Sequence, residues 1–243
     1  MISLVLKIRN YRAILGLIGL QFCLCIPVYA QDDDDFFVFD EEEGPQIADP
    51  FESLNRATFA LNDTMYRRIL KPVAVGFREV PEPARVAFSN FYSNLVTPVS
   101  AINALLQLDL PNTGTEVSRF LINSTVGILG LFDPASSMGI EQDTEDLGQT
   151  LARWGVGHGF FLVVPFYGFS SLRDGLGDLG NAAINPVYNS LSNGEIVGLY
   201  LLDAEISLSF DEDTYEALYQ SSIDPYIFFR TSYIQNRAGS VGQ

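Results

Sequence analysis

Beyond residue 30 this sequence has no cysteine, and the whole chain has a single histidine and a single tryptophan. Both cysteines, Cys23 and Cys25, lie before that point, so the rest of the chain can form no disulfide and offers no thiolate to a metal ion. A zinc site would have to rely on carboxylates, which is unusual for zinc. We therefore expect neither a metal nor another cofactor.

Basic residues are also scarce. The sequence holds 14 lysines and arginines against 30 aspartates and glutamates, and three of the basic residues fall within the first thirty positions. Residues 31–243 thus carry eleven basic and thirty acidic side chains, a formal charge of −19. A surface of this charge repels nucleic-acid phosphates, so we predict no nucleic-acid partner. The 47% hydrophobic content excludes global disorder and predicts a folded domain.

The first thirty residues have the three parts of a secretory signal peptide. A basic start precedes the apolar stretch Ala13–Ile26, and Val28–Ala30 gives a small-x-small ending, which predicts cleavage before residue 31. The apolar stretch is shorter than the roughly 20 residues that a membrane-spanning helix needs. Phe22 and Leu24 precede the two cysteines, where a bacterial lipoprotein would have a small residue. This departure argues against lipid attachment, and the prediction is an exported protein.

Residues 31–48 alternate dense acid with phenylalanine. Eight acids fall between Asp32 and Glu43, interrupted by Phe36, Phe37 and Phe39. Because such charge blocks repel themselves, we expect an acidic disordered tether. It is either a solvated tail or a short apolar hook for a partner. The folded domain is predicted to span residues 49–243.

From Asp49 onward the apolar residues recur at helical spacing. One short stretch, Phe160–Val164, resembles a strand, and a lone strand cannot make a sheet. We therefore predict an essentially all-α fold of short amphipathic helices. The predicted helices are 52–70, one opened by Pro81 and Pro83, a further one after Pro98, 114–132, 145–154, 172–184, 195–208, 213–219 and 224–236.

Long stretches of this region lack any charge. Residues 86–108, 120–132 and 154–172 contain no Asp, Glu, Lys or Arg. Their asparagines, serines and prolines argue against spans that cross a bilayer, because those polar groups would be left in hydrocarbon. Two readings remain open. The helices lie in the plane of a membrane, with one face toward lipid and the Asn/Ser face toward water, or they form a buried core.

A few residues invite a catalytic interpretation. His158, Ser170 or Ser171, and Asp174 could supply the base, nucleophile and acid of a hydrolase. No Gly-x-Ser-x-Gly elbow accompanies them, and the glycines of residues 155–159 lack the spacing of a nucleotide-binding loop. We favour packing and turn roles for this segment, and no enzymatic activity.

Five of the eleven basic residues fall within residues 67–85. Such a cluster could hold a lipid phosphate or an acidic partner. Alternatively, cations near the end of the 52–70 helix interact with its C-terminal dipole. The members are Arg67, Arg68, Lys71, Arg78 and Arg85.

Five ordered blocks then give a resemblance to a known family. They cover nearly all of the chain from residue 49, and together they resemble the MlaA/VacJ family. The blocks are DPFESLNRATFALND (49–63), LKPVAVGFREVPEPARVAFSNFYSNLVTPVSAINALLQ (70–107), RFLINSTVGILGLFDPA (119–135), DLGQTLARWGVGHGFFLVVPFYGFSSLRD (146–174) and DPYIFFRTSYIQNR (224–237).

The resemblance implies a ring of mostly in-plane helices in the outer membrane of Gram-negative bacteria, around a polar channel. Through it, such proteins remove mislocalised phospholipids from the outer leaflet and pass them to a periplasmic lipid-carrier protein, without catalysis. They also associate with trimeric porins. We therefore expect an outer-membrane location on the periplasmic face. Family members are usually lipoproteins, which this sequence does not reproduce.

Helix phase suggests which residues would carry this role. We predict a polar channel rim of asparagines, with an arginine used for headgroup binding or for structural pairing, and phenylalanines facing lipid. The channel residues are Asn90, Asn94, Asn103, Arg85 and Arg119. The lipid-facing residues are Phe88, Phe91, Phe160, Phe161 and Phe166.

An interpretation from another class remains. The chain could be a peripheral periplasmic scaffold that binds a porin-like partner without carrying lipid. Extraction separates the two, since a scaffold leaves membranes in carbonate or high salt whereas an embedded ring requires detergent.

Overall fold

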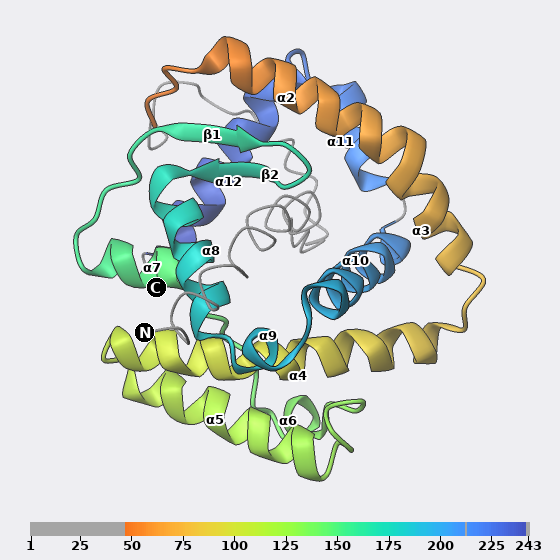
Figure 1. Ribbon diagram of the computed structural model, residues 1–243, viewed down its shortest axis with the longest axis vertical. Helices are drawn as coiled ribbons and strands as arrows, with labels where there is room; N and C mark the ends of the chain where they lie inside the picture. The colour runs from red at the N-terminus through yellow and green to blue at the C-terminus, as the bar shows by residue number, and fades with distance from the viewer. Residues whose placement is uncertain (1–46, 212, 242–243) are drawn as a thin grey trace.

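A computed structural model describes residues 47–211 and 213–241 of the chain. The elements follow one another around a ring, and α2, α3, α4 and the β-hairpin form most of its outline (Figure 1). The first half of the ring consists of α2 (Glu52–Met65), the π-helical turn η2 (Tyr66–Leu70), α3 (Lys71–Phe77), α4 (Glu82–Leu106), α5 (Leu110–Thr125) and α6 (Pro134–Ser137).

The second half returns to the starting point. The signal peptide and most of the predicted tether lie outside the described residues. The remaining elements are α7 (Leu147–Arg153), β1 (Phe161–Val164), β2 (Gly168–Ser171), α8 (Leu172–Ile184), α9 (Pro186–Ser190), α10 (Asn193–Phe210), α11 (Thr214–Ser221) and α12 (Pro225–Val241).

The first predicted helix does not end before Lys71. Its last turn widens into η2, where the backbone N–H of Lys71 bonds the carbonyl of Tyr66. The chain then continues directly into α3, which carries Pro72 in its first turn, where the missing N–H of a proline is tolerated. Proline therefore marks a change of hydrogen-bond register here and not the end of the helix.

Two other boundaries differ from the sequence-based expectation. α4 continues through Pro98, so the two helices predicted around this residue are one helix of 25 residues. α5 ends at Thr125, although its apolar spacing extends to residue 132. Ile128 and Leu129 adopt left-handed backbone angles there, and these break the helix.

The predicted strand finds a partner that the sequence did not reveal. β1 pairs antiparallel with β2, and Leu162 lies opposite Ser170. The chain before α2 also joins this unit, because Ala48 forms a parallel bridge with Phe160 and Ile47 packs on the core. The folded unit thus includes residues 47 and 48, the last two positions of the predicted tether.

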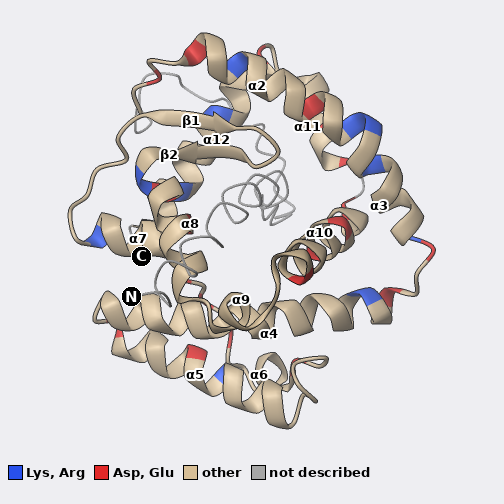
Figure 2. Cartoon of the chain, viewed as in Figure 1, with Lys and Arg blue, Asp and Glu red and all other residues tan. Residues whose placement is uncertain are grey.

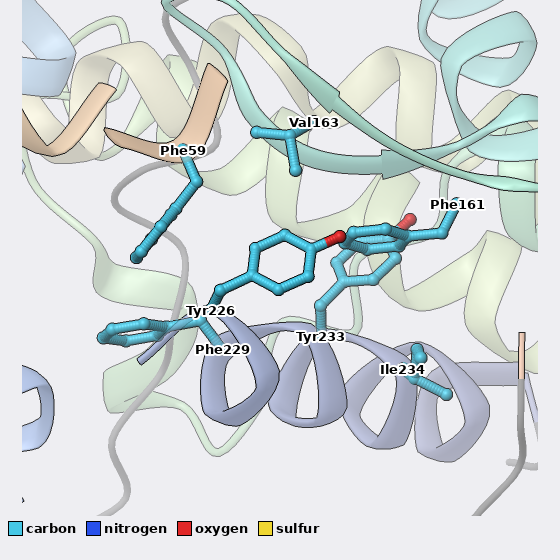
Figure 3. Packing of buried hydrophobic residues seen from close by; sticks show 7 residues of the cluster. All are labelled: Phe59, Phe161, Val163, Tyr226, Phe229, Tyr233 and Ile234. Atoms are coloured by element: carbon cyan, nitrogen blue, oxygen red, sulfur yellow. The ribbon is translucent and has the colours of Figure 1, made fainter. Parts of the chain in front are cut away.

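An aromatic cluster joins α2, the hairpin and α12. Side chains of α12 point toward β1 and toward Phe59 of α2, and Phe161 of β1 is completely buried among them (Figure 3). Its rings pack edge-on or stacked, with the centroids of Phe161 and Tyr233 5.9 Å apart. The buried members are Phe59, Phe161, Val163, Tyr226, Phe229, Tyr233 and Ile234.

The predicted all-α class is confirmed, since the described chain is helical apart from this hairpin. Within residues 47–211 and 213–241, no helix combines the length and the apolar composition that crossing a membrane requires.

Candidate functional site

Two asparagines of α2 clamp the open edge of β1. Asn55 donates its amide N–H to the carbonyl of Phe161 at 3.2 Å and accepts the N–H of Val163 at 2.8 Å. Two helical turns further on, Asn62 donates to the carbonyl of Val164 at 3.0 Å and accepts the N–H of Phe166 at 2.9 Å. Each amide thereby satisfies a strand edge that would otherwise be unpaired, and α2 and the hairpin are held as one unit.

A buried ionic network ties α12 to α7 and α8. The guanidinium of Arg237 lies 2.6 Å from Asp146 at the start of α7 and 2.9 Å from Asp174 in α8. The hydroxyl of Tyr233 donates to the second oxygen of Asp174 at 2.5 Å. Burial alone would raise the pKa of Asp174, but the positive charge and hydrogen bonds of Arg237, together with the bonds from Tyr233 and Arg173, lower it below its ordinary value.

These contacts explain the residues that suggested a hydrolase. The oxygens of Asp174 bond Arg237, Tyr233 and Arg173, and they do not orient an imidazole. The hydroxyl of Ser171 caps α8 by accepting the N–H of Asp174 at 3.1 Å. His158 accepts the N–H of Arg173 through its backbone carbonyl. The hydroxyl of Ser170 donates to the carbonyl of Ser171 at 3.3 Å, so each of the four residues makes a contact that holds the local structure.

The polar side of α4 binds its neighbours. Asn103, with none of its surface exposed, donates to Asn181 of α8 at 2.9 Å and accepts from Thr150 of α7 at 3.2 Å. Asn94 is also buried and donates to Ser124 of α5 at 2.9 Å. The Asn/Ser stripe is used to bond helix to helix, and the prediction that both asparagines line a wet rim stays a prediction. Asn90 is half-buried, and a rim role for it stays a prediction.

Both predicted arginines are structural. Arg85 donates to the carbonyl and hydroxyl of Ser209 at 3.1 and 2.7 Å, and its guanidinium lies over the ring of Phe210 at the end of α10. Arg119 pairs with Asp133 at 2.9 Å and bonds Ser136 at 3.0 Å, which fixes the chain after α5. Both side chains thus form the structural pairing that we predicted as one alternative, and headgroup binding by either of them stays a prediction.

Two members of the basic cluster bond acids of this same chain. Lys71 contacts Asp213 at 2.8 Å and also binds Glu216 of α11, while Arg67 pairs with Asp63 at 2.8 Å. Arg78 donates to a backbone carbonyl at 2.5 Å. Arg68 and Arg78 are the exposed members. The acidic partners of Lys71 therefore lie in and next to the chain's own α11.

α10 packs on the inner side of α3 and α4 and carries acids without bases (Figures 1 and 2). Burial raises the pKa of Asp203 and of Glu205, each to about 7. One carboxylate oxygen of Glu205 is buried without a hydrogen-bond partner. Because such carboxyls are partly protonated near neutral pH, they can donate as well as accept hydrogen bonds.

The predicted lipid-facing phenylalanines fall into three groups. Phe161 does not face outward, because alternation along β1 directs it into the aromatic cluster. Phe88, Phe91 and Phe160 are half-buried, and Phe166 at the hairpin turn is exposed. Lipid contact remains a prediction for these four.

Aliphatic side chains that the sequence analysis did not single out form the larger apolar surface. Leu108, between α4 and α5, has 82% of its surface exposed and a left-handed backbone. The indole N–H of Trp154 donates to the carbonyl of Leu106, which places an exposed ring beside this turn. The exposed set on and around α5 is Leu108, Leu110, Val117, Leu121, Val126, Ile128, Leu129, Phe132 and Met138.

In this region the usual polarity of a surface helix is reversed. α5 buries Asn112, Glu116, Arg119 and Asn123 while its leucines and valine point outward, the reverse of a helix on a water-soluble protein. Figure 2 shows that the charge of α4 is confined to its amino-terminal end, and the residues that α4 buries include Asn94, Ser100 and Asn103. Apolar patches of this extent mark interaction with a membrane or another protein.

This ring of helices buries amides and exposes leucines. It therefore belongs to the class of helical proteins whose surface is adapted to contact lipid or another apolar surface. The family model described as "MlaA lipoprotein" matches residues 47–240, and the chain belongs to this family.

Relatives and a solved structure agree with this assignment. The intermembrane phospholipid transport system lipoproteins MlaA of Escherichia coli (strain K12) and Shigella flexneri are each 37% identical over 193 residues, covering 77% of this chain and 76% of the relative. An uncharacterised Rickettsia typhi protein is 36% identical over 202 residues, 81% of this chain and 79% of that one. A structure described as the basis for maintenance of bacterial outer membrane lipid asymmetry superposes with a TM-score of 0.74 at 33% identity, covering 80% of this chain and 99% of that chain.

Proposed function

We propose that this protein removes mislocalised phospholipids from the outer leaflet of the outer membrane and passes them to a periplasmic carrier. The observation that carries the proposal is the reversed polarity of α4 and α5, which bury amides and ions and expose leucines. Combined with the absence of a membrane-crossing helix among the described residues, this polarity suits helices that lie within one leaflet. The Escherichia coli and Shigella relatives are lipoproteins of an intermembrane phospholipid transport system, which supports the same activity here.

In this proposal the lipid headgroup follows a route inside the ring and avoids the hydrocarbon. Acyl chains would contact the apolar surface near Leu108 and Leu121, and the headgroup would pass the inner side of the ring along α10. Partly protonated carboxyls such as Asp203 can hydrogen-bond phosphate and ester oxygens. Moving a phospholipid makes and breaks no covalent bond, so the transfer needs no catalytic residues. We therefore propose no enzymatic activity. A trimeric porin is the proposed membrane neighbour.

The test combines membrane extraction with analysis of bound lipid. Outer membranes containing the protein are divided between a carbonate wash and a detergent extraction, and the lipid that copurifies with each fraction is measured by mass spectrometry. We expect detergent-dependent protein carrying phospholipid in excess of a mock purification from the same strain without the protein. Release by carbonate of lipid-free protein would contradict the proposal and favour the peripheral scaffold.

A second assay measures the activity itself. In a bacterium that lacks its own family member, expression of this chain should lower the phospholipid exposed in the outer leaflet. Ser170→Ala and Ser171→Ala should retain this activity, provided that both variants fold, and no lysophospholipid should accumulate. Loss of lipid removal in a folded serine variant, together with lipid hydrolysis products in the wild type, would favour the hydrolase.

A further inference from the structure

The loop that follows α5 combines a strained backbone with exposed apolar side chains. Within residues 126–132, Ile128 and Leu129 have φ angles of 53° and 60°, in the left-handed region. Residues other than glycine adopt this conformation at a cost in free energy, and a β-branched residue such as Ile128 is an outlier there. Yet Ile128 is 58% exposed and Leu129 67% exposed, so neither side chain fills the interior.

Other left-handed positions of the chain have ordinary occupants. Glycine, asparagine and aspartate are the residues that visit this region most easily. Asp213 is such a case, and its carboxylate contacts Lys71 at 2.8 Å. After α5 the chain instead places two large apolar side chains on the strained residues. Because they do not serve the interior, they are explained by something outside the chain.

The loop is held in place by close packing and by buried hydrogen bonds. Gly130 lies so close to α4 that a Cβ atom on it would come within 2.4 Å of the Asn94 side chain. Near the end of α5, Asn123 donates to Asp133 at 3.0 Å and accepts the N–H of Ala135 at 3.2 Å. The apolar side chains are therefore presented on a fixed backbone.

The backbone of the loop also satisfies most of its own donors. Six of the seven N–H groups of residues 126–132 donate to carbonyls of the loop or of the end of α5, at 2.8–3.3 Å. No Asp, Glu, Lys or Arg occurs from residue 120 to residue 132. An unpaired backbone group is costly at the edge of hydrocarbon, where water is scarce. The loop can leave bulk water with little of that cost.

We propose that the 126–132 loop inserts its side chains among the acyl chains of one phospholipid leaflet and so sets the depth of α5. An acyl chain needs neither a charge nor a hydrogen bond from the protein, and the side chains of the loop offer neither. The inference rests on the membrane location in the proposed function and adds the place where the chain enters the lipid. The exposed members are Val126, Ile128, Leu129, Leu131 and Phe132.

The opposite end of α5 should lie nearer the water. Leu108 there is also left-handed and exposed, but Asp109 follows it directly. Asn112, in the first turn of α5, bonds the carbonyl of Asp143, which is an exposed acid. Carboxylates are expensive to place in hydrocarbon. We therefore expect α5 to be tilted, with the 126–132 loop deeper than Leu108.

Depth is measured on the full chain in liposomes of phosphatidylcholine brominated on its acyl chains. Each variant also carries Trp154→Phe, because Trp154 is the only native tryptophan. The lipid bromine should quench Leu129→Trp about twofold more strongly than Glu79→Trp, with Leu108→Trp between them. Soluble acrylamide should give the reverse order. Glu79 is the aqueous control, because it is an exposed acid beside the exposed Arg78.

Two further variants test why the strained leucine is kept. Leu129→Gly relieves the left-handed conformation, and Leu129→Asn introduces a residue that tolerates it. Both remove the apolar side chain. The unfolding temperature in detergent should therefore not fall, whereas the fraction of protein that liposomes retain after a carbonate wash should decrease.

Several results would overturn the proposal. Equal lipid quenching of Leu129→Trp and Glu79→Trp would do so, and a Leu129→Trp shielded from both quenchers would indicate a protein neighbour instead. A lower unfolding temperature in both Leu129→Gly and Leu129→Asn would show that the leucine serves the fold. Unquenched Leu129→Trp in protein that resists carbonate contradicts the loop insertion alone, whereas a wild type released by carbonate contradicts the proposed function as well.

Discussion

Where α12 meets the β-hairpin the buried side chains are aromatic, whereas between α4 and α5 they are amides, hydroxyls and charged groups. The first region follows the rule for proteins in water, in which burial of apolar surface drives folding. The second exposes its leucines instead. Such an arrangement is stable only where the exterior is itself apolar, so the comparison indicates which part of the ring is adapted to lipid or to a membrane partner.

The largest effect should come from the aromatic cluster. Phe161→Ala removes a fully buried ring and should lower the free energy of unfolding by about 3–5 kcal/mol, through lost burial and the cavity left behind. Thermal or denaturant unfolding in detergent measures the loss. Leu121→Ala, on the exposed face of α5, is the control and should change stability by less than about 0.5 kcal/mol. Comparable losses for the two variants would remove the distinction between the regions.

The ionic network between α7, α8 and α12 should rank next. Asp174→Asn leaves buried Arg237 and Arg173 with less compensation and should cost about 3 kcal/mol at pH 7. Because the folded-state pKa of Asp174 lies below its ordinary value of 3.8, its stabilising effect is complete above about pH 4 and is lost as the pH falls further.

The pH dependence provides the check on this prediction. The difference in unfolding temperature between the wild type and Asp174→Asn should shrink when the pH is lowered from 7 to 3. Glu79→Gln, at an exposed acid, should follow the wild type at both values. A difference that stays constant with pH would show that the carboxylate charge of Asp174 is not what stabilises the network.

A smaller effect is expected at the polar side of α4. Asn103→Ala should cost about 1–3 kcal/mol, because it leaves the oxygen of Asn181 and the hydroxyl of Thr150 with fewer partners in a buried place. Unfolding in detergent measures this loss, with Asn90→Ala, at a half-buried position, as the comparison. If Asn103→Ala instead left stability intact and altered lipid transport, Asn103 would line the lipid path after all.

The smallest change in stability should accompany a change in membrane behaviour. Leu108→Ser combined with Leu121→Ser should shift the free energy of unfolding by less than about 0.5 kcal/mol per site, since both side chains are already exposed. The fraction of protein retained by membranes after a carbonate wash should nevertheless fall. Unchanged retention would assign the membrane contact to another part of the ring.

Local patterns predicted much of this fold. Apolar spacing located most helices, and the Asp146-x-x-Gln149 capping box that starts α7 could have been read directly. β2 could not be predicted, because the composition of Gly168–Ser171 does not indicate a strand and the segment is defined by its pairing with β1. α4 passes through Pro98, which local rules treat as an interruption.

The site was less accessible to sequence reasoning. Asn103 lies on a polar stripe and Phe161 on an apolar one. The sequence does not reveal that both side chains are buried within the protein. Arg237 was missed for a related reason, since its two carboxylate partners are distant along the chain and are brought together by α12. The stretches without charge did indicate which helices have reversed polarity. They include most of α4 and the end of α5, where leucines are exposed.

The π-helical turn between α2 and α3 has a consequence for chain length. The hydrogen bond of a π-helical turn joins residues five apart, so this turn holds one residue more than an α-helical turn. The extra residue is taken up within the turn, and the helices before and after it keep the same faces on the same side. Removing one residue within Tyr66–Leu70 would therefore let α2 and α3 fuse into a regular α-helix without rotating their outer faces. Single-residue gaps between family members at this turn would accordingly be structurally neutral, whereas the same gap in the middle of α4 would turn buried amides outward.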